Sequence, residues 1–131
     1  MNNWQDWYGD LTKPDWTPSG ETISTIWVIL YSIIFITYGL VFYKFLKKKL
    51  KFKVVLPFII NLGANLSFSP FFFGLKNLEL ALITILVVWL TIIWTVVVIW
   101  KQSRFIALAQ IPYLIWVTIA SILQYNITIS N

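Results

Sequence analysis

Four long stretches of this sequence contain no charged side chain, and they limit the fold more than any other feature. They cover residues 23–43, 54–73, 80–100 and 105–127. Each is 20 to 23 residues long, and a helix of that length measures about 30 to 35 Å, which is enough to cross the hydrocarbon core of a bilayer. Because the connecting loops are short, neighbouring helices must run antiparallel. The sequence therefore predicts an all-α fold, a polytopic membrane helix bundle with four transmembrane helices.

The composition excludes a soluble domain and most metal sites. Hydrophobic residues make up 59% of the chain and charged residues 11%, whereas soluble domains average about 45 to 50% and about 25%. The sequence has neither cysteine nor histidine, and Met1 is its one methionine. Those residue types bind most structural zinc, iron–sulfur clusters and haem iron. We therefore expect no disulfide, no metal site and no resident cofactor.

Basic residues gather in two of the loops between the spans. Residues 44–53 and 101–104 hold eight of the ten, and all five acidic residues lie on the other side of the predicted bundle. A cationic excess between apolar spans indicates topology, so no nucleic-acid partner is expected. The positive-inside rule predicts that both basic loops face the cytoplasm and both termini lie outside. We expect a multi-pass integral membrane protein in the plasma membrane of a prokaryote, with an extracytoplasmic segment at 1–22 and the bundle at 23–131.

Several residues indicate where the helices begin and end. Thr17 followed by Pro18 is typical of an N-cap with proline at the first helical position, so the first span is expected to begin there. Asn77 is predicted to cap the third span, and the segment 69–74 to end the second. Pro112 is expected to kink the fourth span and to leave a backbone carbonyl without its helical partner.

Helical spacing places polar and aromatic side chains on one face of each span. The four faces carry Ser24, Trp27, Tyr31 and Tyr38; Asn61, Asn65, Phe68 and Phe72; Thr84, Thr91 and Thr95; and Ala109, Tyr113, Trp116, Ala120 and Gln124. Lipid offers an amide no hydrogen-bond partner, so Asn61, Asn65 and Gln124 are expected to point into the bundle. Hydrogen bonding between helices is the favoured role for these amides, ahead of ligand contact.

Tryptophan is frequent, with eight residues. Trp27 and Trp116 lie well inside their spans on faces that also carry polar groups, and a buried indole N–H requires a partner, so both are candidates for lining a cavity. Contacts with lipid, helix packing or the membrane interface are expected for Trp4, Trp7, Trp89, Trp94 and Trp100. A cavity formed by the rings of Trp27, Tyr31, Phe68, Tyr113 and Trp116 would suit a flat apolar ligand.

No charged side chain lies inside any predicted span. Ion-coupled transport and voltage sensing normally need one at membrane depth, and acid–base catalysis there would have only tyrosine hydroxyls. A ligand-binding protein is therefore favoured over a pump or an enzyme. Two alternatives stay open: a small four-helix transporter subunit, and a structural bundle without a ligand.

Three sequence blocks follow one another in a recognisable order. WYGDLTKPDWTP at 7–18, with IWVILY at 26–31, is similar to the pattern W-Y-x-x-L-x-K-P-x-W-T-P-P followed by W-x-x-L-Y. NLGANLSFSPFF at 61–72 and PYLIWVTIASIL at 112–123 match two further blocks. Together they resemble the TspO/MBR family, which comprises the tryptophan-rich sensory proteins and the translocator proteins.

The resemblance implies a membrane protein that binds porphyrins or other tetrapyrroles, such as protoporphyrin or haem, and acts as a sensor, regulator or carrier. Family members commonly form homodimers, and several bacterial members promote light-dependent porphyrin breakdown. By motif, Trp27 and Trp116 correspond to the two tryptophans that flank the porphyrin pocket, and the loop at 7–18 covers it. With Tyr113 added from the helical spacing, the expected ligand-binding residues are Tyr8, Trp16, Pro18, Trp27, Tyr31, Asn65, Phe68, Tyr113, Trp116 and Ala120.

The sequence departs from the family pattern at several positions. Ser19 replaces the second proline, Phe68 a tryptophan and Gln124 an asparagine. No Lys or Arg follows Tyr125, so the cholesterol-recognition pattern of animal members is absent and cholesterol transport is not expected. The family has five helices, and its first precedes the W-Y block, which here lies six residues after the first residue. We expect either a start further upstream or a shortened member that lacks one wall of the pocket.

Overall fold

The computed structural model describes residues 3–131, with side chains from Trp7 onward. Its elements are α1 (Asn3–Asp10), α2 (Gly20–Leu46), α3 (Phe52–Ser69), the π-helical turn η1 (Pro70–Gly74), α4 (Leu78–Ile99), α5 (Arg104–Ala109) and α6 (Ile111–Ser130). Within this described part, four helical segments are long and apolar enough to cross a membrane: Gly20–Leu46, Phe52–Gly74, Leu78–Ile99 and Arg104–Ser130. The predicted fold class is confirmed. The side chain of Trp4 lies outside the described residues.

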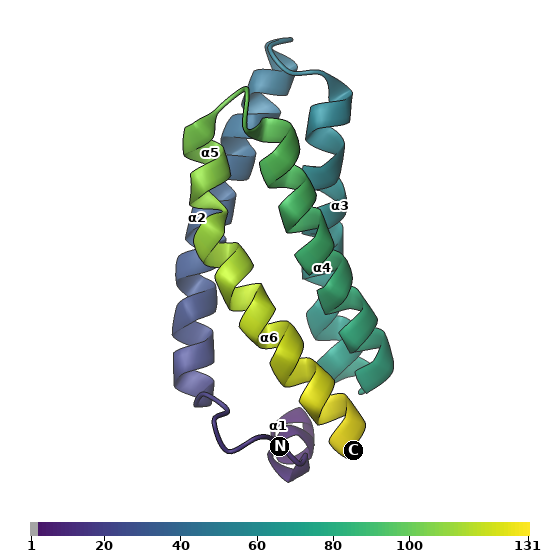
Figure 1. Cartoon of the computed structure of the whole chain (residues 1–131). Coiled ribbons are helices and arrows are strands. Elements are labelled where there is room, and N and C mark those ends of the chain that lie inside the picture. Colours follow the sequence, from purple (N-terminus) through teal and green to yellow (C-terminus); the bar gives the residue numbers. More distant parts are fainter. Residues whose placement is uncertain (1–2) are drawn as a thin grey trace.

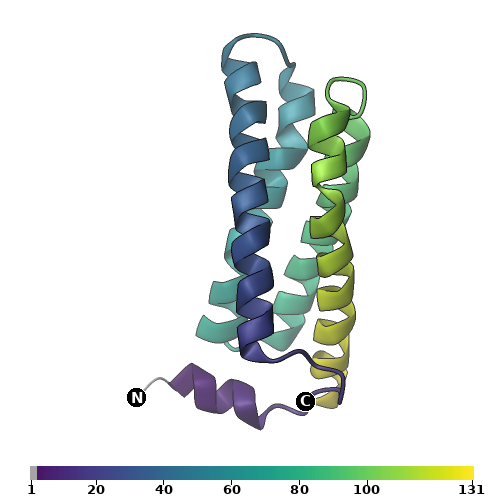
Figure 2. The same ribbon diagram turned by 90° about the vertical axis from the view of Figure 1, so that its left-hand side faces the viewer.

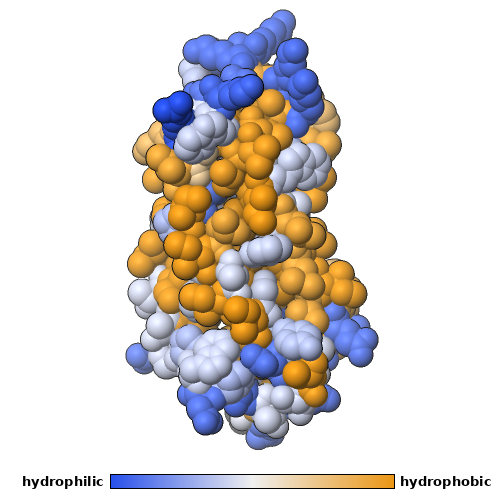
Figure 3. Space-filling view, viewed as in Figure 1, coloured by the Kyte–Doolittle hydropathy of each residue, from blue (hydrophilic) through white to orange (hydrophobic). Residues whose placement is uncertain are grey.

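The four spans form one elongated bundle (Figure 1). α4 packs extensively against both α3 and α6, whereas α2 has smaller interfaces with α3 and α5. α6 runs obliquely across the bundle, and α1 lies across its lower end, close to the C-terminus (Figure 2). Both basic loops lie at the opposite end, where Figure 3 shows a hydrophilic cap above an apolar girdle. Both basic loops therefore lie at the same end of the bundle, as expected.

The capping residues were predicted correctly for one helix and wrongly for another. Asn77 caps α4, since its Oδ1 accepts a hydrogen bond from the backbone N–H of Leu80 at 3.0 Å. The N-cap of α2 is Ser19 instead of Thr17, because Ser19 has the extended backbone that an N-cap needs and accepts from the Thr22 N–H at 3.2 Å. The Thr17 hydroxyl closes an earlier turn by donating to the Pro14 carbonyl at 2.6 Å.

Two spans contain an interruption near a proline. In the second, the α-helix ends at Ser69 as expected, but the chain stays helical through η1, whose wider turn is closed by the Leu75 N–H donating to the Pro70 carbonyl at 2.9 Å. In the fourth, the expected kink takes the form of a one-residue interruption at Gln110, between α5 and α6, with Pro112 in the first turn of α6. The amide of Gln110 spans this interruption, donating to the Ile106 carbonyl at 3.2 Å.

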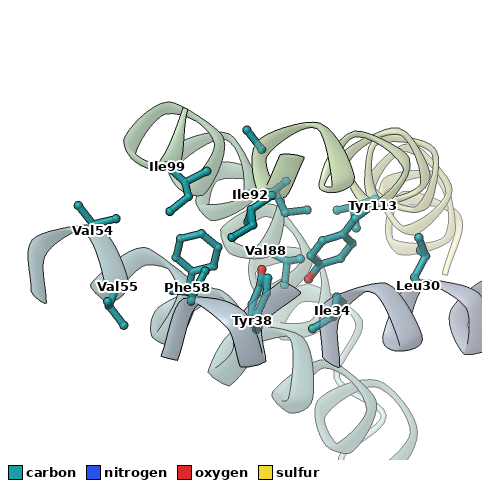
Figure 4. Close-up of a cluster of buried hydrophobic side chains, with 14 of the residues drawn as sticks. Leu30, Ile34, Tyr38, Val54, Val55, Phe58, Val88, Ile92, Ile99 and Tyr113 are labelled. Carbon is teal, nitrogen blue, oxygen red and sulfur yellow. The ribbon is translucent and has the colours of Figure 1, made fainter. Parts of the chain in front are cut away.

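The core lies between α2, α3, α4 and α6. Figure 4 shows Tyr38 of α2 and Tyr113 of α6 reaching toward Val88 of α4, with Phe58 of α3 beside them. Among the amides, Asn61 is 0% exposed, Asn65 5% and Gln124 4%, which confirms that all three point into the bundle. Lipid tails are as apolar as the helices, so the hydrophobic effect does not hold the spans together. Buried amides of this kind contribute hydrogen bonds between them instead.

Candidate ligand-binding cavity

A cavity of about 520 Å³ lies in the half of the bundle nearest α1. That volume is in the range of small-molecule sites, about 300 to 1,000 Å³. Every long helix contributes to the wall, which consists of Tyr8, Gly20, Ile23, Ser24, Trp27, Val28, Tyr31, Asn65, Phe68, Ser69, Phe72, Phe73, Ile85, Val88, Trp116, Ala120, Leu123, Gln124 and Ile127. None of these described lining residues is charged, so the cavity suits an apolar body with a few polar groups.

Two pairs of stacked rings form part of the wall. On α2, the rings of Trp27 and Tyr31 stack with centroids 5.3 Å apart, because residues four positions apart lie one turn above each other. On α3 and η1, the rings of Phe68 and Phe72 stack at 5.6 Å with an interplanar angle of 10°. Flat aromatic faces of this kind pack well against another flat ring system.

The inner wall carries a chain of hydrogen bonds. The Tyr31 hydroxyl donates to Asn65 Oδ1 at 2.7 Å, and Asn65 Nδ2 donates to the Tyr113 hydroxyl at 2.6 Å. The Tyr113 hydroxyl in turn donates to Asn61 Oδ1 at 3.1 Å, where the Tyr38 hydroxyl also donates, at 2.6 Å. These hydrogen bonds connect α2, α3 and α6 and fix the position of Tyr31 and Asn65, two of the polar residues that line the cavity.

These hydrogen bonds extend through Asn61 to α4. Asn61 Nδ2 donates to the Thr91 hydroxyl at 2.9 Å and to the Val88 carbonyl at 3.1 Å. Thr91 itself donates to the Val87 carbonyl one turn earlier, at 2.7 Å. Asn61 is therefore the point at which all four spanning segments are hydrogen-bonded together, in agreement with the structural role predicted for the amides.

Trp116 combines burial with an unsatisfied donor. Its side chain is 8% exposed and lines the cavity, and its indole N–H is buried without an acceptor among the described residues. An unsatisfied buried donor costs about 1 to 3 kcal/mol. Trp89 shows the usual alternative, since its indole N–H donates to the Thr118 hydroxyl at 2.8 Å across α4 and α6.

Residues 7–18, here called the lid segment, lie across the lower end of the bundle and contribute Tyr8 to the cavity wall. Tyr8 lines the cavity, and its ring lies 5.9 Å from that of Phe72, which Trp7 also contacts edge-on at 5.2 Å. Burial raises the pKa of Tyr8, because desolvation disfavours the ionised phenolate. Lys13 holds the turn by donating to the Tyr8 and Leu11 carbonyls at 2.8 and 3.1 Å.

A second contact joins the lid segment to the end of α6. The Thr12 N–H donates to Asn131 Oδ1 at 3.0 Å, and Asn131 Nδ2 donates back to the Thr12 carbonyl at 3.0 Å. The same Nδ2 donates to the Ile127 carbonyl at 2.8 Å, which fixes the amide against the last turn. The lid segment is thus held at two places, by an aromatic cluster and by one amide.

The structure brings seven of the ten expected ligand-binding residues to the cavity wall: Tyr8, Trp27, Tyr31, Asn65, Phe68, Trp116 and Ala120. Three do not line it. Trp16 is 49% exposed in the lid segment, and Pro18 lies in the chain leading to α2. Tyr113 is fully buried behind the wall, where its hydroxyl joins Asn65 to Asn61. Ligand contact by any of the ten stays a prediction.

The cavity also has lining residues that were not on the predicted list. Ser24, Phe72 and Gln124 fall on the faces identified from helical spacing, so that spacing could have indicated them. Val88 of α4 lies on the face of Thr84, Thr91 and Thr95, so the same spacing could have indicated it, whereas Ile85 lies beside that face and is an ordinary apolar residue in an apolar span. The position of Ile85 depends on how α4 rotates against α3 and α6.

The fold and the cavity define a class of protein: a multi-pass helical membrane protein with an uncharged, aromatic-walled cavity. Comparison with known families identifies it further, since residues 1–129 match the model of the TspO/MBR family. The chain belongs to the TspO/MBR family.

Individual relatives agree. The chain is 37% identical over 127 residues to an uncharacterised membrane protein, YtaB, of Bacillus subtilis, covering 97% of this chain and 81% of that one. It is 35% identical over 121 residues to the tryptophan-rich protein TspO of Bacillus cereus, covering 92% and 78%. It is also 30% identical over 130 residues to the human translocator protein, covering 95% and 75%.

Proposed function

We propose that this protein binds a tetrapyrrole such as protoporphyrin in the cavity and acts as a membrane sensor or carrier of that ligand. The observation that carries the proposal is the cavity wall, in which rings from α2, α3, η1 and α6 surround an uncharged space. Relatives are named as sensory or translocator proteins, which favours binding over catalysis. A flat aromatic macrocycle gains area burial and about 0.5 to 1.5 kcal/mol for each ring it stacks on.

The chemistry of the wall fits such a ligand in two respects. The stacked pairs offer flat faces, and the Trp116 N–H is a buried donor that an acceptor on a ligand would satisfy. The wall has no imidazole or thiol, because the sequence contains no histidine or cysteine. Binding therefore depends on stacking and burial, and the iron of a haem is not needed for it.

Ligand titration of matched variants tests the proposal. The full chain, purified in detergent, is titrated with protoporphyrin while the porphyrin absorbance band is followed. Replacing both Trp27 and Trp116 with Phe is expected to raise Kd about 5- to 100-fold, since each shortened ring loses part of a stacking contact. The matched control replaces Trp94 and Trp100, which are 40% and 42% exposed on the outside of the bundle, and should leave Kd unchanged.

Two results would reject this function. An unchanged Kd in the Trp27 and Trp116 variant would place the ligand elsewhere. Absence of saturable binding by the intact chain would favour the structural bundle. Thermal unfolding of each variant in the same detergent checks that a loss of affinity does not come from a loss of fold.

We also propose that the two basic loops face the cytoplasm of a prokaryotic cell. Both loops lie at one end of the bundle and the acidic residues toward the other, and relatives occur in Bacillus. Because the chain has no cysteine, single cysteines at Lys49 and at Asp15 can be labelled without background. A membrane-impermeant maleimide added to intact cells should label the cysteine at Asp15 and not that at Lys49; the reverse pattern would invert the topology.

A further inference from the structure

The end of the bundle opposite the cavity carries a dense positive surface that ligand binding does not use. Residues 44–53 and 101–104 contain eight basic residues and no acidic one. Seven of the eight are exposed: Lys47, Lys48, Lys49, Lys51, Lys53, Lys101 and Arg104. They form the hydrophilic cap of Figure 3, which we call the basic end.

The chain cannot neutralise the basic end itself. Glu21 is in the first turn of the 27-residue α2, about 40 Å from the lysines at the other end of that helix. Glu79 is similarly placed at the start of the 22-residue α4, about 30 Å away. Charges interact weakly through water beyond the Debye length, about 8 Å at physiological ionic strength. The counter-charge for the basic end therefore comes from outside the chain.

Helix dipoles explain only part of this clustering. Lys44 and Lys47 lie at the C-terminus of α2, where a cation is favourable. Lys51 and Lys53 lie instead at the N-terminus of α3, and Arg104 begins α5, where the dipole disfavours a cation. Three cations thus occupy positions that are unfavourable for the isolated helices, and an external anion would offset that cost.

Exposed apolar side chains place the basic end at the level of lipid headgroups. Tyr43 is 55% exposed, Phe52 54% and Phe105 67%, all next to the basic loops. Tyrosine and tryptophan at such positions partition into the membrane interface, and Trp100, which is 42% exposed, lies next to the second basic loop. Two cations also lie over rings, with Lys47 Nζ 5.7 Å from the Tyr43 centroid and the Arg104 guanidinium 5.4 Å from the Trp100 centroid.

The turn that presents three consecutive lysines has a fixed backbone. Lys48 adopts a left-handed φ of 60°, and the turn is closed by the Lys49 N–H donating to the Lys44 carbonyl at 2.8 Å and the Lys48 N–H donating to the Phe45 carbonyl at 2.9 Å. This arrangement ends α2 and keeps the three side chains on a short, ordered connection.

We propose that the basic end binds the phosphate headgroups of anionic phospholipids, with Lys47, Lys48 and Lys49 as its main contacts. The flanking aromatic residues hold the loop at headgroup depth, and the cations supply the charge that the lipid phosphates balance. A soluble acidic protein would meet the same charges, but it would not account for the exposed apolar side chains beside them.

The experiment compares lipids with equal acyl chains and different headgroups. The full chain in neutral detergent is titrated with phosphatidylglycerol or with phosphatidylcholine, and retained lipid is counted by native mass spectrometry. Phosphatidylglycerol should bind at least tenfold more tightly, and 0.5 M NaCl should remove most of that preference. Since each cation near an anionic surface contributes about fivefold, Lys48→Asn should weaken binding about fivefold, and adding Lys47→Gln and Lys49→Gln should abolish the preference.

Lys76→Asn is the matched control. Lys76 also has a left-handed φ, 53°, but it lies at the other end of the bundle, so its substitution should leave lipid binding unchanged. Asparagine tolerates this conformation at both positions, which keeps the folds comparable. Equal binding of the two lipids, or an equal loss in Lys48→Asn and Lys76→Asn, would overturn the proposal. Competition by free phosphate, or equally tight binding of a polyglutamate peptide, would also overturn it, in favour of a soluble anion or an acidic protein.

Discussion

Replacing Asn61 with leucine tests the hydrogen-bonded chain that supports the cavity wall. Asn61 is 0% exposed, and its amide accepts from the Tyr38 and Tyr113 hydroxyls and donates to Thr91 and to the Val88 carbonyl. Leucine has a similar size but offers no partner. The Tyr38 hydroxyl, whose single proton points to Asn61 Oδ1, would then be buried without an acceptor.

The size of the effect follows from these four contacts. Hydrogen bonds between membrane helices contribute about 0.6 kcal/mol on average and at most about 1.7 kcal/mol. Asn61→Leu should therefore reduce the free energy of unfolding by about 2 to 3 kcal/mol. Tyr38→Phe removes one of these bonds and should cost about 0.6 to 1.7 kcal/mol in the wild-type chain. In the Asn61→Leu background it should cost close to nothing, because the hydroxyl has already lost its acceptor.

The assay is reversible unfolding in mixed micelles with increasing dodecyl sulfate, followed by circular dichroism. A double-mutant cycle on Asn61 and Tyr38 should give a coupling energy of about 1 kcal/mol. Tyr43→Phe is the control, since Tyr43 is 55% exposed and its substitution should change stability little. Additive effects of Asn61→Leu and Tyr38→Phe, within about 0.3 kcal/mol, would show that the hydrogen bond does not stabilise the bundle.

Three further predictions follow from other contacts. Asn131→Ala removes both hydrogen bonds to Thr12, so the lid segment should open more readily. Stopped-flow measurements should then show porphyrin association and dissociation each up to about fivefold faster. Unchanged rates would mean that this contact does not limit access to the cavity. Trp89→Phe should lower the free energy of unfolding by about 0.6 to 1.7 kcal/mol by removing the bond to Thr118. Thr118→Val should then cost less in the Trp89→Phe background than in the wild-type chain, and an equal or larger cost would contradict this pairing. Haem and metal-free protoporphyrin should bind with Kd values within about tenfold of each other. The sequence has no histidine or cysteine to ligate iron, the Tyr31 hydroxyl is bonded to Asn65, and burial raises the pKa of Tyr8, which disfavours the phenolate that would ligate iron. Spectroscopic titration showing a hundredfold preference for haem would indicate an axial ligand.

The spans themselves could be predicted from the sequence because lipid imposes a strict rule. A helix that crosses the bilayer must be long and uncharged, so the four apolar stretches correspond to the four spans. The orientation of Asn61, Asn65 and Gln124 followed from the same rule, since an amide has no partner in lipid.

The ends of the helices were less predictable because several residues compete for each role. Thr17 and Ser19 are both good N-caps, and the choice of Ser19 depends on how the lid segment turns before α2. In the fourth span, a kink was expected at Pro112, and the structure has an interruption of the helix two residues earlier, at Gln110. The side-chain amide of Gln110 donates to the Thr37 hydroxyl at 3.0 Å and to the Ile106 carbonyl at 3.2 Å. These bonds stabilise the one-residue interruption, and local sequence does not reveal them.

For the cavity, residues on a helical stripe could be assigned to a face, but their depth could not. Tyr31 and Tyr113 both carry a hydroxyl on a predicted inner face, yet Tyr31 lines the cavity and Tyr113 lies behind it. That difference depends on the packing of α6 against α4. The bond between Asn131 and Thr12 joins residues 119 positions apart, and no local pattern predicts such a contact.

Fluorine NMR of the protein labelled with 5-fluorotryptophan tests the central claim most directly, because each indole reports its own surroundings. Single Trp→Phe variants assign the resonances. If a porphyrin stacks in the cavity, saturating protoporphyrin should shift the signals of Trp27 and Trp116 strongly and leave those of Trp94 and Trp100 in place. Shifts confined to Trp94 and Trp100, with Trp27 and Trp116 unchanged, would place the ligand on the outer surface of the bundle and contradict the assignment of the cavity as its binding site.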